Sequence, residues 1–112
     1  MQDSAILDTE VVSELQEVMG QDFQMLVDSF LRDGEQRMSA LQSAFEAGDQ
    51  EALRQQAHSF KGSSGNLGAV NVFALCMQLE SLAREGELSQ VPDLLSRLRQ
   101  SFDEACDHLR RL

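Results

Sequence analysis

The sequence predicts an all-α fold, an antiparallel up-down-up-down four-helix bundle with a short extra helix at the N-terminus. Apolar residues recur at the helical period along nearly the whole chain of 112 residues. Helix breakers are rare, and the one proline is Pro92. The loops between the expected helices are a few residues long, which makes consecutive helices antiparallel neighbours. We therefore expect a single domain that spans residues 1–112.

The first two helices are delimited by residues that commonly begin and end helices. A short helix is expected to start at Asp8, a good N-cap, and to run to Met19, because Gly20 follows. A long helix begins near Gln21 and ends at Gly48. Its core-facing stripe is expected to contain Phe23, Leu26, Phe30, Gly34, Met38, Leu41 and Phe45.

The third and fourth helices are joined by a turn around residues 66–68. Asp49 is expected to cap the third helix and Asn71 the fourth, which ends at Gly86. The core stripe of the third helix is expected to contain Leu53, Ala57, Phe60 and Ser64. That of the fourth is expected to contain Val72, Leu75, Leu79 and Leu82. The short turn predicts that these two helices form an antiparallel hairpin.

The fifth helix is expected to be capped by Ser89, with Pro92 tolerated in its first turn. Its buried seam is expected to contain Val91, Leu94, Leu95, Leu98, Phe102, Cys106 and Leu109. Apolar stripes of this kind on four long helices bury enough surface for an independent fold at this length.

Composition argues against several classes of partner. The net charge is −10, and Lys and Arg do not follow one face, which argues against nucleic acid and anionic membranes. There is no signal-peptide pattern and no membrane-spanning apolar run, so we expect a soluble, cytoplasmic protein. An acidic surface without a spare apolar helix face predicts a monomer. Cys76 and Cys106 match no metal or redox spacing, and we expect both to be reduced and buried.

A single histidine stands out in the stretch AHSFKGSSGNLGAVN. His58 lies beside the core stripe of the third helix and shares its face with Arg54, Lys61, Gly62 and Gly65. A glycine inside a helix costs about 1 kcal/mol relative to alanine. Two glycines beside a histidine therefore predict a bare surface on which another macromolecule can approach the imidazole.

The charge around this histidine differs from that of the rest of the chain. No Asp or Glu lies between residues 52 and 79, although the chain holds 19 of them. A phosphoryl group could therefore rest there, one helical turn from the Lys61 ammonium. Each feature also has a simpler explanation. The missing acids can reflect burial, and the glycines can mark a frayed helix end. A lone surface histidine usually has no function, as we expect for His108. The combination of these features favours a site.

The predicted hairpin supplies a partner for the histidine. The chain reverses near Ala69, so equal steps on either side of the turn bring His58 opposite Glu80. A carboxylate at that position could accept a hydrogen bond from Nδ1–H of the imidazole. This bond would fix the tautomer and leave the Nε2 lone pair free as a nucleophile.

The run HSFKGSSGNLG, which starts at His58, resembles the signature of histidine-containing phosphotransfer (HPt) domains. That signature is a histidine, two residues, a lysine, a glycine, small residues and a later glycine. The resemblance covers the whole chain and fits a stand-alone bacterial HPt protein. It implies that His58 is the phosphoacceptor through Nε2, that Lys61 neutralises the phosphoryl group and helps to dock the partner, and that Gly62 leaves room for that partner. Lys61 is expected on the solvent side of its helix.

The family often has a Gln or Glu on the next helix that bonds the histidine. Counting without gaps, this position is Glu80, and Gln78 is the weaker candidate. Receiver domains in the family bind beside the histidine on the second and third helices. The exposed candidates on the third helix are Arg54, Gln55, Ser59 and Gly65. On the second helix, Phe30, Leu31 and Arg32 would flank them only where that part of the stripe reaches the surface.

The resemblance implies that the chain carries a phosphoryl group between receiver-domain aspartates, from a hybrid sensor kinase to a response regulator. It implies no cofactor for this chain, because the receiver supplies Mg²⁺. The sequence has no P-loop or Gly-rich nucleotide motif, so we expect a carrier without ATP-dependent kinase activity rather than an enzyme. One alternative is a non-catalytic bundle that binds and sequesters a receiver domain. Another is an enzyme, such as a histidine-based phosphatase or a four-helix metal protein, although no Glu-x-x-His pattern faces His58.

Overall fold

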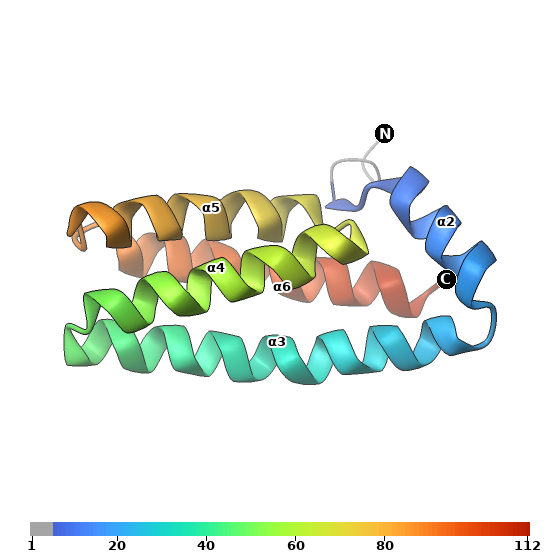
Figure 1. Ribbon diagram of the computed structural model, residues 1–112, viewed down its shortest axis with the longest axis horizontal. Coiled ribbons are helices and arrows are strands. Elements are labelled where there is room, and N and C mark those ends of the chain that lie inside the picture. The colour runs from blue at the N-terminus through green and yellow to red at the C-terminus, as the bar shows by residue number, and fades with distance from the viewer. Residues whose placement is uncertain (1–5) are drawn as a thin grey trace.

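The computed structural model describes residues 6–112, and helices make up all the regular secondary structure in this range. The predicted all-α class is therefore confirmed. The helices are α2 (Thr9–Met19), α3 (Asp22–Ala47), α4 (Gln50–Leu67), α5 (Val70–Glu85) and α6 (Val91–Arg110) (Figure 1). The first five residues of the predicted domain lie outside the described part of the chain.

The helices α3, α4, α5 and α6 lie side by side along the longest dimension, and each runs back along the one before it (Figure 1). The overall extents are 42 × 26 × 18 Å. α2 lies across the end at which α3 begins and α4 ends. The backbone N–H of Asp8 donates to the carbonyl oxygen of Gly68 over 2.7 Å, which ties the start of α2 to the turn between α4 and α5.

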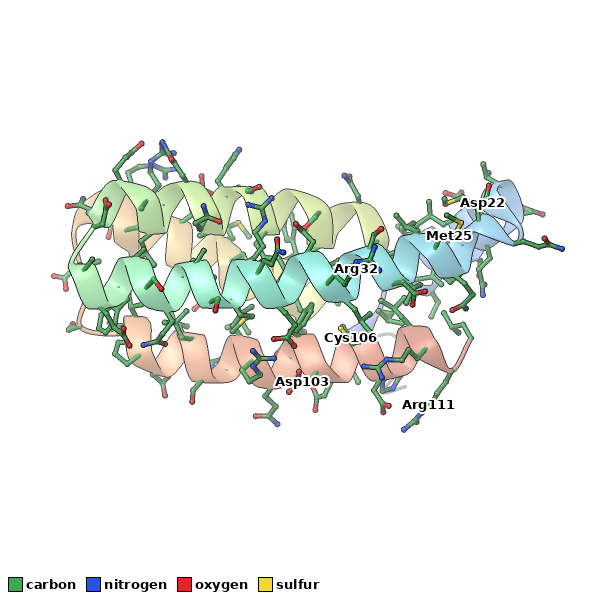
Figure 2. The ribbon with its side chains drawn as sticks, turned by 90° about the horizontal axis from the view of Figure 1, so that it is seen from below. Asp22, Met25, Arg32, Asp103, Cys106 and Arg111 are labelled. Carbon is green, nitrogen blue, oxygen red and sulfur yellow. The ribbon has the colours of Figure 1, made fainter. Side chains whose placement is uncertain are left out.

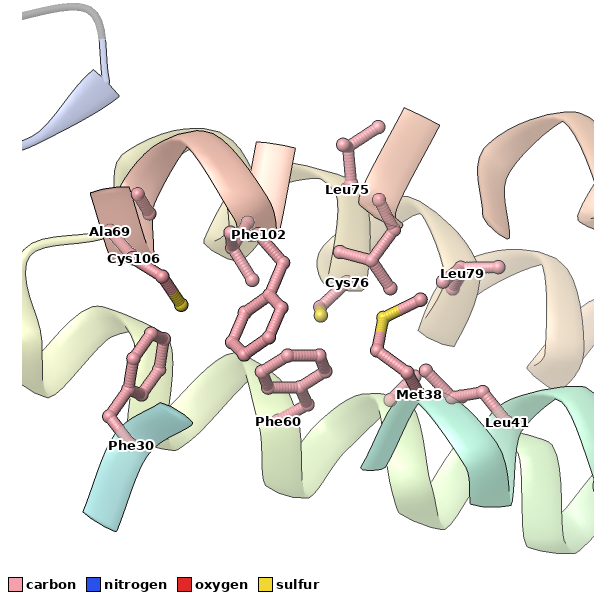
Figure 3. Packing of buried hydrophobic residues seen from close by; sticks show 14 of the residues in the cluster. Phe30, Met38, Leu41, Phe60, Ala69, Leu75, Cys76, Leu79, Phe102 and Cys106 are labelled. Atoms are coloured by element: carbon pink, nitrogen blue, oxygen red, sulfur yellow. The ribbon is translucent and has the colours of Figure 1, made fainter. Parts of the chain in front are cut away.

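Three phenylalanine rings meet in the core, one each from α3, α4 and α6 (Figure 3). The ring centroid of Phe102 lies 5.5 Å from that of Phe30 and 5.7 Å from that of Phe60. Gly34 on α3 lies against this cluster, because a Cβ atom there would overlap the Phe102 ring. The missing side chain at Gly34 therefore lets α6 place Phe102 against the backbone of α3.

The predicted stripes of the third and fifth helices are buried in α4 and α6. On α3, Leu26 and Phe45 are only partly buried, and Val27 and Ala44 lie in the core instead. Because the α-helix has about 3.6 residues per turn, the buried positions of a long helix advance by steps of three and four. The positions of the large apolar residues alone do not show whether a given step is three or four residues. Leu82 on α5 is likewise only partly buried.

Two predicted N-caps are confirmed by their hydrogen bonds. Oδ1 of Asp8 accepts from the backbone N–H groups of Glu10 and Val11 at 3.1 and 3.3 Å. Oδ1 of Asp49 accepts from the backbone N–H of Ala52 at 3.0 Å. These carboxylates satisfy N–H groups that the first helical turn leaves without a partner. The glycines predicted to end α3 and α5 have φ values of 67° and 76°, the left-handed conformation that closes many helices.

The cap predicted at Asn71 is wrong, because α5 begins at Val70 with Ala69 as its N-cap. Ala69 is fully buried, so this position has no room for a polar capping side chain. Its backbone N–H donates to the carbonyl oxygen of Ser64 at 2.9 Å. The chain therefore turns directly from α4 into α5, and Asn71 lies in the first turn of the helix.

The cap predicted at Ser89 is also wrong, and Gln90 is the N-cap of α6. From position 89, a capping side chain would serve the N–H groups of Val91 and Pro92. The N–H of Val91 already donates to the carbonyl oxygen of Leu88 at 3.2 Å, and proline has no N–H. Ser89 therefore has no donor left to cap.

Candidate functional site

His58 on α4 faces Glu80 on α5 across the helical hairpin. Nδ1 of His58 lies 2.9 Å from Oε2 of Glu80, so the predicted pairing is confirmed. Because a carboxylate only accepts hydrogen bonds, Nδ1 carries the proton and donates it to Oε2. The Glu80 side chain is 6% exposed, whereas the His58 side chain is 64% exposed. Glu80 therefore holds the imidazole ring from the core side, and Nε2, with its lone pair, is left facing solvent.

Cationic side chains hold both oxygens of Glu80. Nζ of Lys61 lies 2.7 Å from Oε1, and Nη2 of Arg84 lies 3.2 Å from Oε2. The hydrogen bond from Lys61 is the main reason why the pKa of Glu80 lies below its ordinary value of 4.5; burial opposes this shift, and the bond from His58 adds to it. Glu80 is therefore a carboxylate at neutral pH, and a carboxylate at this position can stabilise positive charge on the imidazole.

Lys61 is less exposed than the sequence suggests. Its side chain is 24% exposed and its ammonium group is bound to Glu80. The hairpin brings a buried carboxylate within reach of the long lysine side chain, which draws the ammonium group inward. An ammonium group has three N–H donors, so Lys61 can hold Glu80 and still donate to a phosphoryl group on Nε2 of His58.

Arg84 belongs to this cluster, although the sequence pattern around His58 does not indicate it. It lies four residues after Glu80 on α5, a spacing that places both side chains on one helix face. Its own side chain is 61% exposed. The Glu–Arg spacing is the signal that could have indicated it. Arg54, predicted to share the face of His58, donates to both carboxylate oxygens of Glu51 at 3.0 and 2.6 Å.

The two glycines that follow His58 differ in their surroundings. A Cβ atom at Gly62 would meet no neighbouring side chain within 4 Å, so internal packing does not require a glycine there. A Cβ atom at Gly65 would lie 3.1 Å from the Phe73 ring of α5. Gly65 therefore has a packing role that the sequence does not indicate, and Gly62 is the better candidate for a residue kept small for a partner.

The other residues predicted to dock a partner lie on α4 and α3. Gln55 is exposed and Ser59 is partly exposed. On α3, Arg32 is exposed (Figure 2) and Leu31 partly exposed, whereas Phe30 is buried. The surface contact considered for Phe30 is therefore not available. Its ring instead contributes to the floor of a groove of about 720 Å³ between α2, α3 and the end of α4.

The remaining titratable candidates have local explanations. Cys76 and Cys106 are free and buried, as predicted, and burial raises the pKa of each thiol to about 12. Nδ1 of His108 lies 2.9 Å from the carbonyl oxygen of Glu104, one turn earlier on α6. Within residues 6–112, no group of three or more His, Cys, Asp or Glu side chains is placed to hold a metal ion. In the same range, no helix combines the length and the apolar character needed to cross a bilayer.

Comparisons with known proteins agree with this geometry. Residues 25–108 match the family model of the Hpt domain. A comparison with curated proteins gave no match. Among solved structures, the chain is similar to the crystal structure of histidine-containing phosphotransfer protein B (HptB) from Pseudomonas aeruginosa, with 42% sequence identity and a TM-score of 0.91. This match covers 94% of the present chain and 91% of HptB.

A second solved structure supports the fold. The histidine-containing phosphotransfer domain of ArcB from Escherichia coli matches 99% of this chain and 95% of its own, with a TM-score of 0.86 and 19% identity. The family match includes the whole α4–α5 hairpin, with His58 and Glu80 facing each other across it. On the family match and the similarity to HptB, the chain belongs to the Hpt domain family.

Proposed function

We propose that this chain is a phosphoryl carrier of a phosphorelay. It would accept a phosphoryl group at Nε2 of His58 from a receiver domain of a hybrid sensor kinase and pass it to a response regulator. The observation that carries the proposal is the 2.9 Å contact between Nδ1 of His58 and the buried Glu80 in a member of the Hpt family. In this proposal, α3 to α6 are the antiparallel four-helix bundle expected from the sequence, which presents His58 on its side.

The transfer step uses the two ring nitrogens in different roles. The Nε2 lone pair attacks phosphorus and forms an N–P bond, while the P–O bond to the receiver aspartate breaks and its carboxylate leaves with the electron pair. The ring then carries a positive charge, and Nδ1–H remains bonded to the carboxylate of Glu80, which stabilises that charge. Lys61 and Arg84 offset the negative charge of the phosphoryl oxygens. Attack by the aspartate of the second receiver reverses the step.

In this proposal, the chain needs no metal or cofactor of its own. Oε1 of Glu80 accepts from Lys61, and Oε2 accepts from His58 and Arg84, so the charge of this carboxylate is already paired with cationic side chains. We expect the receiver to supply Mg²⁺ and most of the transition-state stabilisation. The chain is then a substrate and donor in the relay, without kinase activity toward ATP.

The test is phosphate transfer from a phosphorylated receiver domain to the purified wild type and to the variants His58→Gln and His108→Gln. We expect an acid-labile, base-stable label on the wild type and on His108→Gln, and none on His58→Gln. His108 is the matched control because it is the other histidine of the chain. A label that persists on His58→Gln and is lost from His108→Gln would show that the site is assigned to the wrong histidine.

The same experiment separates the carrier from a docking module. A module that only sequesters receivers would bind the phosphorylated receiver without acquiring a label in the wild type. Binding is measured by titration calorimetry on the same samples. Binding without label on the wild type would contradict the carrier, and we would then assign the chain to the sequestering class.

Gly62→Gln is expected to slow transfer from a receiver domain by on the order of tenfold or more, because the longer side chain would collide with the docked receiver. Phosphorylation of His58 by a small donor such as phosphoramidate is expected to stay unchanged, since Gly62 faces open space. Rates with the two donors are compared in one preparation. An equal loss with both donors would mean that the new side chain covers Nε2 itself, and no loss with the receiver would remove Gly62 from the interface.

A further inference from the structure

An apolar ridge lies on α5 beside the proposed phosphorylation site. It consists of Phe73 and Met77, which lie one helical turn apart on the same face. The Phe73 ring lies against Gly65 of α4 and remains partly exposed. Met77 is 46% exposed. The other large apolar side chains exposed in residues 6–112 lie outside the α4–α5 hairpin. The Phe73–Met77 ridge is therefore the apolar feature nearest to His58 on this hairpin.

Any protein that contacts His58 comes within reach of this ridge. Two contacts set the register of the hairpin: His58 faces Glu80, and Gly65 faces Phe73. Met77 lies between these contacts on α5. With a rise of about 1.5 Å per residue and helices packed about 8–10 Å apart, Met77 is roughly 10 Å from His58. A typical interface covers about 800 Å² on each partner, a patch of roughly 16 Å radius, and such a patch includes Met77 when it is centred on His58.

The two sides of His58 offer different chemistry to such a partner. On the α3 side, Arg37 donates to Gln56 at 3.1 Å and to Asp33 at 3.4 Å, so charged and polar groups border the site. On the α5 side, the ridge presents an aromatic ring and a thioether. Interface cores are enriched in aromatic residues and methionine, and the methionine side chain adapts its shape to different surfaces. The α5 side can therefore add an apolar contact to an interface that surrounds His58.

The charges next to the ridge indicate which partner covers it. Arg84 lies beyond Glu80 on α5, and Arg54 lies one turn before His58 on α4. Arg54 is paired with Glu51, and Lys61 and Arg84 are both paired with Glu80. These three cations outnumber the two carboxylates, which leaves an excess of positive charge beside His58 in a chain whose net charge is −10. A partner that delivers a phosphoryl group from an aspartate presents an acidic, phosphate-bearing pocket, which these cations complement. A receiver domain has this chemistry, and its acidic pocket would lie over these cations.

We propose that the Phe73–Met77 ridge is part of the receiver-docking surface and that Met77 contributes to the affinity for the receiver domain. This inference rests on the proposed function. Met77→Gln keeps the approximate size of the side chain and removes its apolar character. For the receiver that binds the wild type most tightly in a purified panel, it is expected to raise Kd by roughly tenfold. Met77→Leu is expected to bind within about twofold of the wild type.

Met25→Gln is the matched control, because Met25 is 68% exposed and lies near the start of α3, at one end of the molecule (Figure 2). This variant is expected to bind like the wild type. An unchanged Kd for Met77→Gln, or equal losses for both glutamine variants, would overturn the inference. Phosphorylation of His58 by phosphoramidate is measured in parallel and is expected to be the same in all variants. If the wild type accepts no phosphate but binding follows the expected order, the docking inference holds and the carrier function fails.

Discussion

Gly34→Ala is expected to destabilise the protein by about 2 kcal/mol, although alanine is the better helix former. The new Cβ atom would overlap the ring of Phe102, which is 1% exposed and packs against two other phenylalanine rings. To relieve this overlap, α3 and α6 must separate or the ring must leave its present rotamer. The measurement is the free energy of unfolding from urea denaturation.

Gly62→Ala is the control for this prediction, and the expected sign is opposite. Gly62 is also inside a helix, but a Cβ atom there meets no neighbouring side chain. The alanine variant is expected to be more stable than the wild type by about 0.5–1 kcal/mol. In a second control, Phe102→Leu in the Gly34→Ala background is expected to recover part of the loss. If Gly34→Ala were as stable as the wild type, the close packing of α3 on α6 would be wrong.

Glu80→Ala is expected to release His58 from a single tautomer and to slow phosphoryl transfer by on the order of 10- to 100-fold. Without the carboxylate, Nδ1 loses the acceptor it has on α5, and the ring can move its proton to Nε2, the nucleophilic atom. Nitrogen-15 NMR of the imidazole reports the tautomer directly. Glu80→Gln keeps an oxygen acceptor at this position and is expected to retain most of both properties. A wild-type spectrum in Glu80→Ala would remove Glu80 from its positioning role.

The ion pairs of Glu80 are also expected to make the free energy of unfolding depend on pH. A carboxyl group whose pKa is lower in the folded than in the unfolded chain stabilises the fold above its unfolded-state pKa. This contribution is lost as the pH falls through the folded-state pKa. Hydrogen bonding from Lys61 lowers the pKa of Glu80 from 4.5. The stability difference between the wild type and Glu80→Gln is therefore expected to be constant near neutral pH and to shrink below the ordinary pKa. A difference that stays constant into strong acid would contradict the ion pair.

The contact between His58 and Glu80 can be predicted from the sequence because it depends on local geometry. The helical rise is fixed, so the pairing across a hairpin depends only on where the chain reverses. The wrong cap at Asn71 does not disturb this pairing, since the centre of the turn remains near Ala69. The polar caps Asp8 and Asp49 are predictable for a similar reason, because each acts on N–H groups within three residues.

The parts of the site that the sequence does not predict depend on contacts between side chains of α4 and α5. The sequence suggests a solvent-facing Lys61, but the buried carboxylate of Glu80 draws its ammonium group inward. Arg84 joins the same carboxylate from α5. The sequence predicts an open surface at Gly65, but in the structure the ring of Phe73 lies against it. Each of these features depends on the distance between two helices. The spacing of residues along one helix does not give this distance.

The position of the site within one helical hairpin has a consequence for how the protein folds. His58 and Glu80 are separated by 22 residues, and α4 and α5 form the most extensively packed helix pair. Contacts between residues close in sequence form quickly, because little chain entropy is lost in closing the loop between them. The packing of Phe102 on Gly34 closes a far longer loop. We therefore expect His58 and Glu80 to meet early during folding, before α3 and α6 pack against each other.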